Sequence, residues 1–277
     1  MKKRVRPAIL ILIAIALAVI FITPLLWMVS ISFKDDVEAI LPNLNIIPDN
    51  PTIANYVNVL TGGDLNVPIL RWIFNSLFVG VVTTVLVVMI DALAAYGLAR
   101  LDIPFKKVIF SMIVSTMMIP NIVWFLPLYA EFSALQLTDT YWALILPYTS
   151  GAFGVFLLYQ FFVSFPKEIE EAAYLDGANK FQIFYRILLP SAKPALWTLA
   201  ILTFMGVFND FVWPLYATSS DEMRTLTAGI AIMTQGSYVN TPNKMMALST
   251  IATIPVLLVF LIGQKSFVKA VTQVGIK

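Results

Sequence analysis

The chain contains no cysteine and no histidine among its 277 residues. Without cysteine it cannot form a disulfide, use a thiolate nucleophile or build a cysteine-ligated metal site. Without histidine it also lacks the commonest general base and metal ligand. The composition therefore argues against an enzyme active site and predicts no metal centre.

Charged residues are also scarce. Asp, Glu, Lys and Arg make up 12% of the residues, whereas 59% are hydrophobic. An ordinary soluble domain carries about 25% charged residues. The composition is that of an integral membrane protein. The sequence contains no Gly-x-x-x-x-Gly-Lys-[Ser/Thr] loop, so we do not expect the chain to bind ATP by that route. No cofactor is expected in this chain.

Six long apolar runs divide the chain, and each can supply the roughly 20 residues that a helix needs to cross a bilayer. The predicted spans are 7–33, 72–90 extending past Asp91 to about 99, 108–130, 140–166, 194–209 extending past Asp210 to about 217, and 245–264. The first run is expected to be a retained helix, because its uncharged length exceeds the roughly 7–15 residues of a signal-peptide core. Lipid tails cannot form hydrogen bonds with backbone N–H and C=O groups. Irregular backbone is therefore expected in the loops or at Pro120, Pro127, Pro147 and Pro255.

The positive charges predict the orientation. If the N-terminus is inside, the inside segments around 2–6, 100–107, 167–193 and 265–277 hold 14 Lys and Arg residues. The outside segments 34–71 and 218–244 hold 4. Loops rich in Lys and Arg stay in the cytoplasm. Both termini and the loop 164–194 are therefore predicted to be cytoplasmic.

That loop carries a spaced motif. Glu171-Ala172-Ala173 is followed by Gly177 and then by Ile187-x-Leu189-Pro190. A first helix is expected to begin near Pro166 and to end in a sharp or left-handed turn at Gly177. A second is expected over 179–188, with Asn179 as its N-cap and Pro190 ending it. Its apolar face would hold Phe181, Phe184, Tyr185 and Leu188.

The pattern alone fits two interpretations. The hairpin is either a docking element for a soluble partner or an amphipathic hairpin that lies on the membrane surface. The motif resembles the E-A-A loop of ABC importer permeases, and the run 166–178 resembles its version in carbohydrate-uptake permeases of the maltose/multiple-sugar class. Three further stretches are similar to that class: Leu137-Thr138-Asp139-Thr140-Tyr141-Trp142-Ala143, Phe208-Asn209-Asp210-Phe211-Val212-Trp213-Pro214-Leu215 and Phe267-Val268-Lys269.

The resemblance implies an all-α integral membrane protein with the type I ABC importer permease fold and six transmembrane helices. It is closest to the shorter, six-span partner of a permease pair. Residues 1–71 would form the N-terminal helix and first external loop, and residues 72–277 a transport core of five helices with the coupling loop 164–194. Span one would pack against the partner permease.

The function implied is ATP-driven import of a sugar or oligosaccharide across a bacterial or archaeal cytoplasmic membrane. The implied partners are a second permease, two cytoplasmic ATPase subunits that hold ATP and Mg, an extracytoplasmic solute-binding protein and membrane lipid; no nucleic acid is expected. The ATPase-coupling residues carried over from the family are Glu171, Ala172, Ala173, Gly177, Ile187, Leu189 and Pro190. A glycerol-phosphate or polyol importer is the nearest alternative, which the lack of a basic residue inside the spans disfavours.

Polar residues inside the spans require a reason, since a central carboxylate costs about 2.5–3.5 kcal/mol on insertion scales. Asp91, nine residues before Arg100, is expected in an interfacial or interhelical ion pair. Asp210 is expected either to line the pathway or to make a structural hydrogen bond across the interface with the partner permease. The candidate pathway residues are Asn209, Asp210, Asn121 and Asn75.

Two other classes of protein fit the sequence less well. A self-contained secondary transporter or channel usually shows inverted repeats or charges along a path, and neither is evident here. An intramembrane enzyme would need an Asp pair or a Ser-Lys arrangement. Asp91 and Asp210 are predicted at opposite depths, which disfavours an Asp pair.

Overall fold

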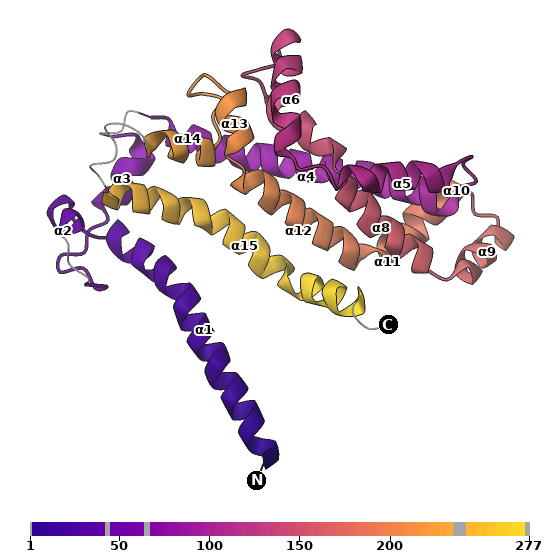
Figure 1. The fold of residues 1–277 in the computed structure, drawn as a ribbon, viewed down its shortest axis with the longest axis horizontal. Helices are drawn as coiled ribbons and strands as arrows, with labels where there is room; N and C mark the ends of the chain where they lie inside the picture. The colour runs from indigo at the N-terminus through magenta and orange to yellow at the C-terminus, as the bar shows by residue number, and fades with distance from the viewer. Residues whose placement is uncertain (1, 42–44, 64–66, 235–241, 275–277) are drawn as a thin grey trace. The chain divides into compact units, whose positions relative to one another are not determined.

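The computed structural model describes residues 2–41, 45–63, 67–234 and 242–274, and every regular element in them is helical. Gly236, in the second predicted external loop, and Lys277 lie outside the described residues. Figure 1 shows the helices. They are α1 (Lys2–Ser32), α2 (Asp36–Ile40), α3 (Ala54–Thr61), α4 (Ile69–Arg100), α5 (Lys106–Thr116), α6 (Ile122–Ala134), α7 (Tyr141–Ile145), the 3-10 helix η1 (Leu146–Ser150), α8 (Ala152–Ser164), α9 (Lys167–Leu175), α10 (Lys180–Ile183), the π-helical turn η2 (Phe184–Leu188), α11 (Leu189–Ser191), α12 (Lys193–Asn209), α13 (Val212–Ala217), α14 (Leu226–Met233) and α15 (Pro242–Val274).

Three of these helices are long and apolar enough to cross a membrane: Ile9–Ser32, Ile69–Arg100 and Pro242–Gln264. They correspond to the first, second and sixth predicted spans. Two bent pairs raise the number of candidate spans among the described residues to five, namely 141–149 with 152–164, bent by 41°, and 180–191 with 193–209, bent by 74°. The six-span count and the side on which the termini lie stay predictions.

The third predicted span is not a continuous helix. The expected run 108–130 is divided into α5, which ends at Thr116, and α6, which begins at Ile122. Pro120 has no N–H to donate and disfavours helical geometry at the residue before it, which explains the break. Around Pro147 the backbone forms the tighter 3-10 helix η1. Pro127 and Pro255, in contrast, lie inside α6 and α15.

The chain divides into two compact units. One comprises Met1–Arg71 with Gly229–Pro255, and the other Trp72–Ala228 with Val256–Lys277. In the first unit, the buried side chain of Asn243 donates to the Lys34 carbonyl at 3.2 Å, to Asp36 Oδ1 at 2.8 Å and to Asn55 Oδ1 at 2.9 Å. Asn55 donates in turn to the Ser32 and Lys34 carbonyls. These amides tie the end of α1 to the start of α15.

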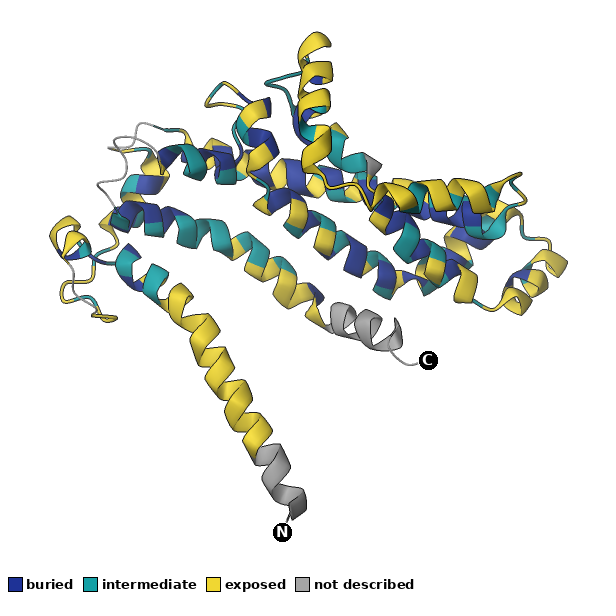
Figure 2. Cartoon of the chain, in the orientation of Figure 1, coloured by how far each residue is buried: buried dark blue, intermediate teal, exposed yellow. Residues whose placement is uncertain are grey.

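The second unit has its main core where α4, α8 and α12 meet the hairpin 164–194. Figure 2 shows buried residues along α8 and α12. The core is formed by apolar residues from all four segments, including Ala95, Leu158, Phe162, Ile183, Leu188 and Leu199. Gly154 of α8 allows a close approach to α4 and α12. A Cβ there would lie 2.8 Å from Leu199 Cδ1 and would overlap the carboxylate of Asp91.

This packing predicts opposite effects for two helical glycines. Gly154→Ala should lower the free energy of unfolding by about 1–3 kcal/mol, because the added methyl group overpacks the contact with Asp91 and Leu199. Gly206→Ala, in α12 with nothing within 4 Å of its Cβ position, should raise it by about 0.5–1 kcal/mol, because alanine favours the helix. Thermal unfolding of the purified protein in detergent, followed by tryptophan fluorescence, would measure both. Shifts of the same sign would contradict the assigned packing.

Candidate functional site

The first arm of the hairpin is α9, and its end is fixed by a glycine turn. Gly177 adopts φ +83°, in the left-handed region that favours glycine. Its N–H donates to the Tyr174 carbonyl at 3.0 Å, and the Ala178 N–H donates to the Ala173 carbonyl at 2.9 Å. This pair of bonds is the Schellman motif, which closes a helix by satisfying its last carbonyls. The predicted turn at Gly177 is confirmed.

The second arm begins as predicted and then departs from the prediction. Asn179 caps α10 in a capping box with Gln182, in which each side chain accepts the other residue's backbone N–H at 2.9 Å. The helix then widens into the π-helical turn η2 and continues as α11 to Ser191. The expectation that Pro190 ends this helix is wrong. Pro190 lies in the first turn of α11, where a missing N–H costs little.

The chain bends at Ala192 between α11 and α12. The two helical segments that meet there differ in direction by 74°. Ala192 is fully buried, and it donates to the Leu188 carbonyl and accepts from the Leu196 N–H, both at 2.9 Å. Hydrogen bonds therefore continue on both sides of the bend.

The hairpin has one buried and one exposed apolar side. The predicted apolar face of its second arm is split, because Phe184 and Leu188 are buried whereas Phe181 is 70% and Tyr185 62% exposed. The π-helical turn changes the angular spacing of these residues, which a 3.6-residue period does not anticipate. The other exposed large apolar side chains of the hairpin are Ile169, Tyr174 and Leu175.

The motif residues lie on both sides of this hairpin. Glu171, Ala172, Gly177 and Pro190 are exposed, and Ala173, Ile187 and Leu189 are half-buried. The half-buried members pack against the core of the second unit. The structure thus separates residues that a soluble partner could contact from residues that hold the hairpin in place.

The C-terminal end of α4 anchors the hairpin. Arg100 Nε lies 2.8 Å from Glu170 Oε1, and Arg100 Nη2 donates to the Phe165 carbonyl at 2.6 Å. Tyr96 Oη donates to the Lys180 carbonyl at 2.9 Å. Burial raises the pKa of Glu170, an effect that Arg100 and Lys167 oppose. The E-A-A motif predicted a role for Glu171 and none for its buried neighbour Glu170; only the positions of the two carboxylates around α9 distinguish them.

Asp91 does not pair with Arg100 as expected, because Arg100 is engaged by Glu170. Asp91 is 2% exposed and lies against Gly154. Its Oδ2 makes no hydrogen bond within the described residues. A nine-residue separation on the continuous helix α4 places the two side chains about 13.5 Å apart along the axis and on opposite faces, and Arg100 turns towards the hairpin instead.

Asp210 lies at the break between α12 and α13 and holds that break together. Tyr148 Oη donates to Asp210 Oδ2 at 2.6 Å, and the Val212 N–H donates to Oδ1 at 3.0 Å. The Asp210 carbonyl accepts from Thr227 Oγ1 at 2.7 Å. Its neighbour Asn209 is exposed. The carboxylate therefore makes structural hydrogen bonds within this chain.

The two remaining asparagine candidates differ in their surroundings. Asn75 is fully buried; its amide donates to the Glu222 and Arg224 carbonyls at 2.7 and 2.8 Å and accepts from Tyr141 Oη at 2.7 Å. Asn121 is exposed at the break before α6. Asn75 thus joins α4 to the loop 218–226 and to α7.

Asp139 joins a second loop to the same segment. Its Oδ1 accepts from the Ser219 N–H, the Ser220 N–H and the Ser220 hydroxyl, each at 3.0 Å. The Asp139 N–H donates to the Ala217 carbonyl at 2.7 Å. Partial burial raises the pKa of Asp139, but the hydrogen bonds from the two serines and the charge of Arg224 outweigh it, so that the net pKa is lowered.

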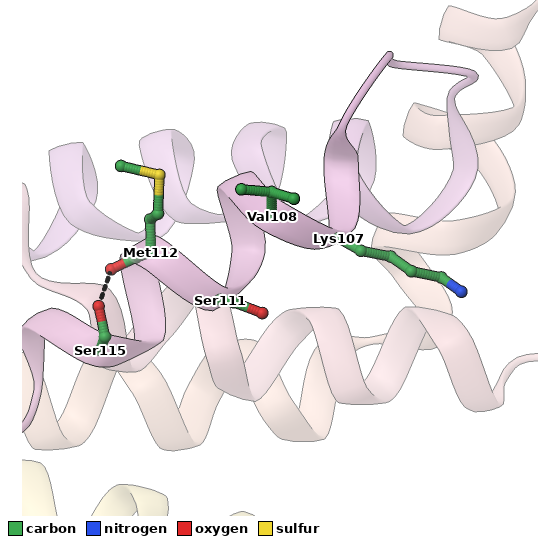
Figure 3. A pocket seen from close by; sticks show the side chains of 5 residues that line it. All are labelled: Lys107, Val108, Ser111, Met112 and Ser115. Carbon is green, nitrogen blue, oxygen red and sulfur yellow. Dashed lines mark hydrogen bonds between the residues drawn. The ribbon is translucent and has the colours of Figure 1, made fainter.

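A shallow groove runs along α5, lined by Lys107, Val108, Ser111, Met112 and Ser115. Figure 3 shows these side chains on one helix, with the Ser115 hydroxyl bonded to the Met112 carbonyl at 2.8 Å. One of the few polar groups in the groove is thus used within the helix. Among the described residues, no group of three or more Asp and Glu side chains could hold a metal ion.

Comparisons with known proteins agree with this architecture. Residues 92–273 match the family described as binding-protein-dependent transport system inner membrane component. The chain is 33% identical over 263 residues to the arabinooligosaccharides transport system permease protein AraQ of Bacillus subtilis, covering 94% of this chain and 92% of that protein. It is 32% identical over 281 residues to the trehalose/maltose transport system permease protein MalG of Thermococcus litoralis, covering 100% and 99%.

Another relative, the sn-glycerol-3-phosphate transport system permease protein UgpE of Rhizobium meliloti, is 32% identical over 259 residues and covers 92% of each chain. Among solved structures, the fold is similar to a chain of a bacterial ABC transporter involved in the import of the acidic polysaccharide alginate. The TM-score is 0.84 at 22% identity, and the match covers 96% of this chain and 98% of that chain.

The hydrogen bonds of Asp139 predict acid sensitivity. Its pKa is lowered by folding, so it stabilises the fold above the unfolded pKa of about 3.9, and this contribution is lost as the pH falls through the lower folded pKa. Asp139→Asn, which tolerates the left-handed backbone, should lower the free energy of unfolding at pH 7 by about 1 kcal/mol. The loss should shrink in acid. Thermal unfolding between pH 3 and 7 measures it, with the exposed Asp102→Asn as control. A pH-independent difference would contradict the assignment.

Proposed function

This chain belongs to the family of binding-protein-dependent transport system inner membrane components, and we propose that it carries a sugar or oligosaccharide into the cell. Family members are non-catalytic permease subunits of ABC importers in the cytoplasmic membrane, so catalysis of ATP hydrolysis belongs to a different subunit. The chain itself has no ATP-binding loop of the Gly-x-x-x-x-Gly-Lys-[Ser/Thr] type, so ATP hydrolysis must act on it through a contact with another subunit. The hairpin 164–194 is the observation that supports this contact.

A neutral sugar is the proposed class of substrate. Arabinooligosaccharides and trehalose/maltose are the solutes in the names of two relatives, and glycerol-3-phosphate is the solute of a third. A phosphate would be held most readily by a basic side chain inside the bundle. Between Trp72 and Ala99 of α4, between Pro194 and Asn209 of α12, and between Met245 and Gln264 of α15, the sequence has no Lys or Arg. This absence favours a neutral solute over a phosphate ester.

The proposed assembly is this chain with a second permease, two ATPase subunits that hold ATP and Mg, and an extracytoplasmic solute-binding protein. We propose six spans with both termini in the cytoplasm, as the distribution of Lys and Arg indicates. Residues 72–277 would form the transport core and residues 1–71 a peripheral helix and external loop. Closure of the ATPase dimer would then favour one of two alternating states of the permease pair.

The exposed side of the hairpin is the proposed contact with the ATPase. The apolar side chains of Phe181, Tyr185 and Leu175 are exposed there, close in sequence to the carboxylate of Glu171 and to Ala172. An exposed apolar group rimmed by polar residues is typical of a protein–protein contact. Of the asparagine and aspartate candidates for the pathway, Asn209 and Asn121 are the strongest, since both are exposed and, among the described residues, neither side chain makes a structural hydrogen bond of the kind that engages Asp210 and Asn75.

Two substitutions should uncouple ATP hydrolysis from transport. Glu171→Lys reverses an exposed charge in the proposed contact. Gly177→Pro forces φ to about −65° where the structure has +83° and removes an N–H that bonds the Tyr174 carbonyl. Transport per ATP hydrolysed in a reconstituted complex should fall about tenfold, within the usual range of coupling energies.

Asp102→Lys is the matched control, because it reverses an exposed charge in a different predicted cytoplasmic loop. Insertion of each variant is checked by its yield in the membrane fraction. Wild-type transport per ATP in both hairpin variants would remove the hairpin from the coupling mechanism.

The assembly itself is tested by affinity purification of the tagged chain from native membranes, with mass spectrometry of the proteins that accompany it. We expect an ATPase, a second permease and a solute-binding protein, and the binding protein can then be screened against neutral sugars and glycerol phosphate. Recovery of the chain alone, in a detergent that preserves another ABC complex, would instead favour a self-contained secondary transporter.

A further inference from the structure

The last turn of α4 makes polar contacts with both arms of the hairpin. Tyr96 and Arg100 are four residues apart and so project from the same face of the helix. Tyr96 bonds the Lys180 carbonyl at the start of the second arm. Arg100 bonds the Phe165 carbonyl just before the first arm and lies against Glu170 within it. The two arms are thus held by one helical turn.

These contacts are shielded from water. The side chains of Arg100 and Glu170 are 6% and 10% exposed. Tyr96 is also buried, with its ring centroid 4.8 Å from that of Phe184 and 6.4 Å from that of Phe162. The Arg100–Glu170 contact is a close ion pair whose N–H is not well aligned for a hydrogen bond. Removing one partner of such a pair leaves a buried charge uncompensated, which costs far more than breaking a surface ion pair.

The other end of α4 is hydrogen-bonded to the loop 221–226. Trp72 Nε1 donates to the Asp221 carbonyl at 2.7 Å, and Asn75 donates to the carbonyls of Glu222 and Arg224. The Leu226 N–H donates to Ser76 Oγ at 2.8 Å. All three α4 side chains are buried. A helix of 32 residues is about 48 Å long, so α4 connects this loop to a hairpin that lies at its far end.

We propose that α4 links the loop 221–226 to the hairpin as one rigid element, and that Arg100 and Glu170 are the positioning residues at the hairpin end. The proposal rests on the proposed function, in which the hairpin receives the movement of the ATPase. Energetic coupling over such distances is carried by rigid helices whose ends are fixed by packed or hydrogen-bonded side chains. A movement of the hairpin is then transmitted through Arg100 to α4 and, through Trp72 and Asn75, to the loop 221–226.

The test uses the complete complex, reconstituted with its ATPase and binding protein. Arg100→Gln and Glu170→Gln should each lower the amount of solute transported per ATP hydrolysed by about fivefold to tenfold. Arg100→Lys should lie between Arg100→Gln and wild type, because lysine keeps the charge but not the forked donors. Lys107→Gln, which removes an exposed positive charge close in sequence to Arg100, is the matched control and should behave as wild type.

Hydrogen–deuterium exchange gives the readout that separates transmission from simple stability. In the wild-type complex, ATP should change the exchange of both 167–175 and 221–226. In Arg100→Gln the response of 167–175 should persist and that of 221–226 should be lost. Wild-type ratios of solute to ATP in both glutamine variants, or an unchanged response of 221–226, would overturn the proposal.

Two further outcomes are decisive. Tyr96→Phe removes only the hydroxyl that bonds Lys180, and it should reduce coupling in the same direction by a smaller factor. If Arg100→Gln fails to assemble while Tyr96→Phe couples as wild type, the contacts are purely structural and the proposal is wrong. A wild-type complex that recovers no ATPase or transports nothing would instead refute the proposed function, and the two failures are thereby distinguishable.

Discussion

Every interruption of a helix within lipid exposes backbone groups that only the protein can satisfy, and this constraint explains where Asp210 and Asn75 lie. An unsatisfied N–H or C=O in hydrocarbon costs several kcal/mol. At the end of α12, Asp210 accepts the Val212 N–H and a hydroxyl from Tyr148. Asn75 satisfies two carbonyls of the loop 218–226 from inside α4. Asp210 and Asn75 are therefore placed where irregular backbone needs them, whereas Asp91 Oδ2 makes no hydrogen bond within the described residues.

The hairpin 164–194 combines two requirements that usually conflict. In the proposed coupling role it must be exposed to be contacted by another protein, and it must be held firmly to transmit a movement. Two adjacent glutamates meet these requirements separately. Glu170 is buried against Arg100, and Glu171 is exposed. Its second arm divides its aromatic residues in the same way, with Phe184 buried and Phe181 exposed. Anchoring and contact are thus assigned to different side chains of the same short helices.

The sequence predicted the features that are local. The turn at Gly177, the cap at Asn179 and the break at Pro120 follow from backbone chemistry that one or two residues decide, and the long helices of the first, second and sixth predicted spans follow from their composition. It did not predict which distant groups meet. Asp91 and Arg100 are about 13.5 Å apart along the continuous helix α4 and on opposite faces of it, so Arg100 needs a partner from another segment, and only the tertiary fold shows that this partner is Glu170. The π-helical turn also escaped prediction, because a 3.6-residue period assumes uniform winding.

The 74° bend at Ala192 has a mechanical consequence. A bend made by a glycine linker would act as a swivel and would let the hairpin turn without moving the rest of the chain. Here the residue is fully buried, and hydrogen bonds run on both sides of it, to Leu188 and from Leu196. Burial and these hydrogen bonds fix the bend, so in the proposed coupling a movement of the hairpin would change the tilt of α12. The other end of α12 lies at the junction where Tyr148 donates to Asp210.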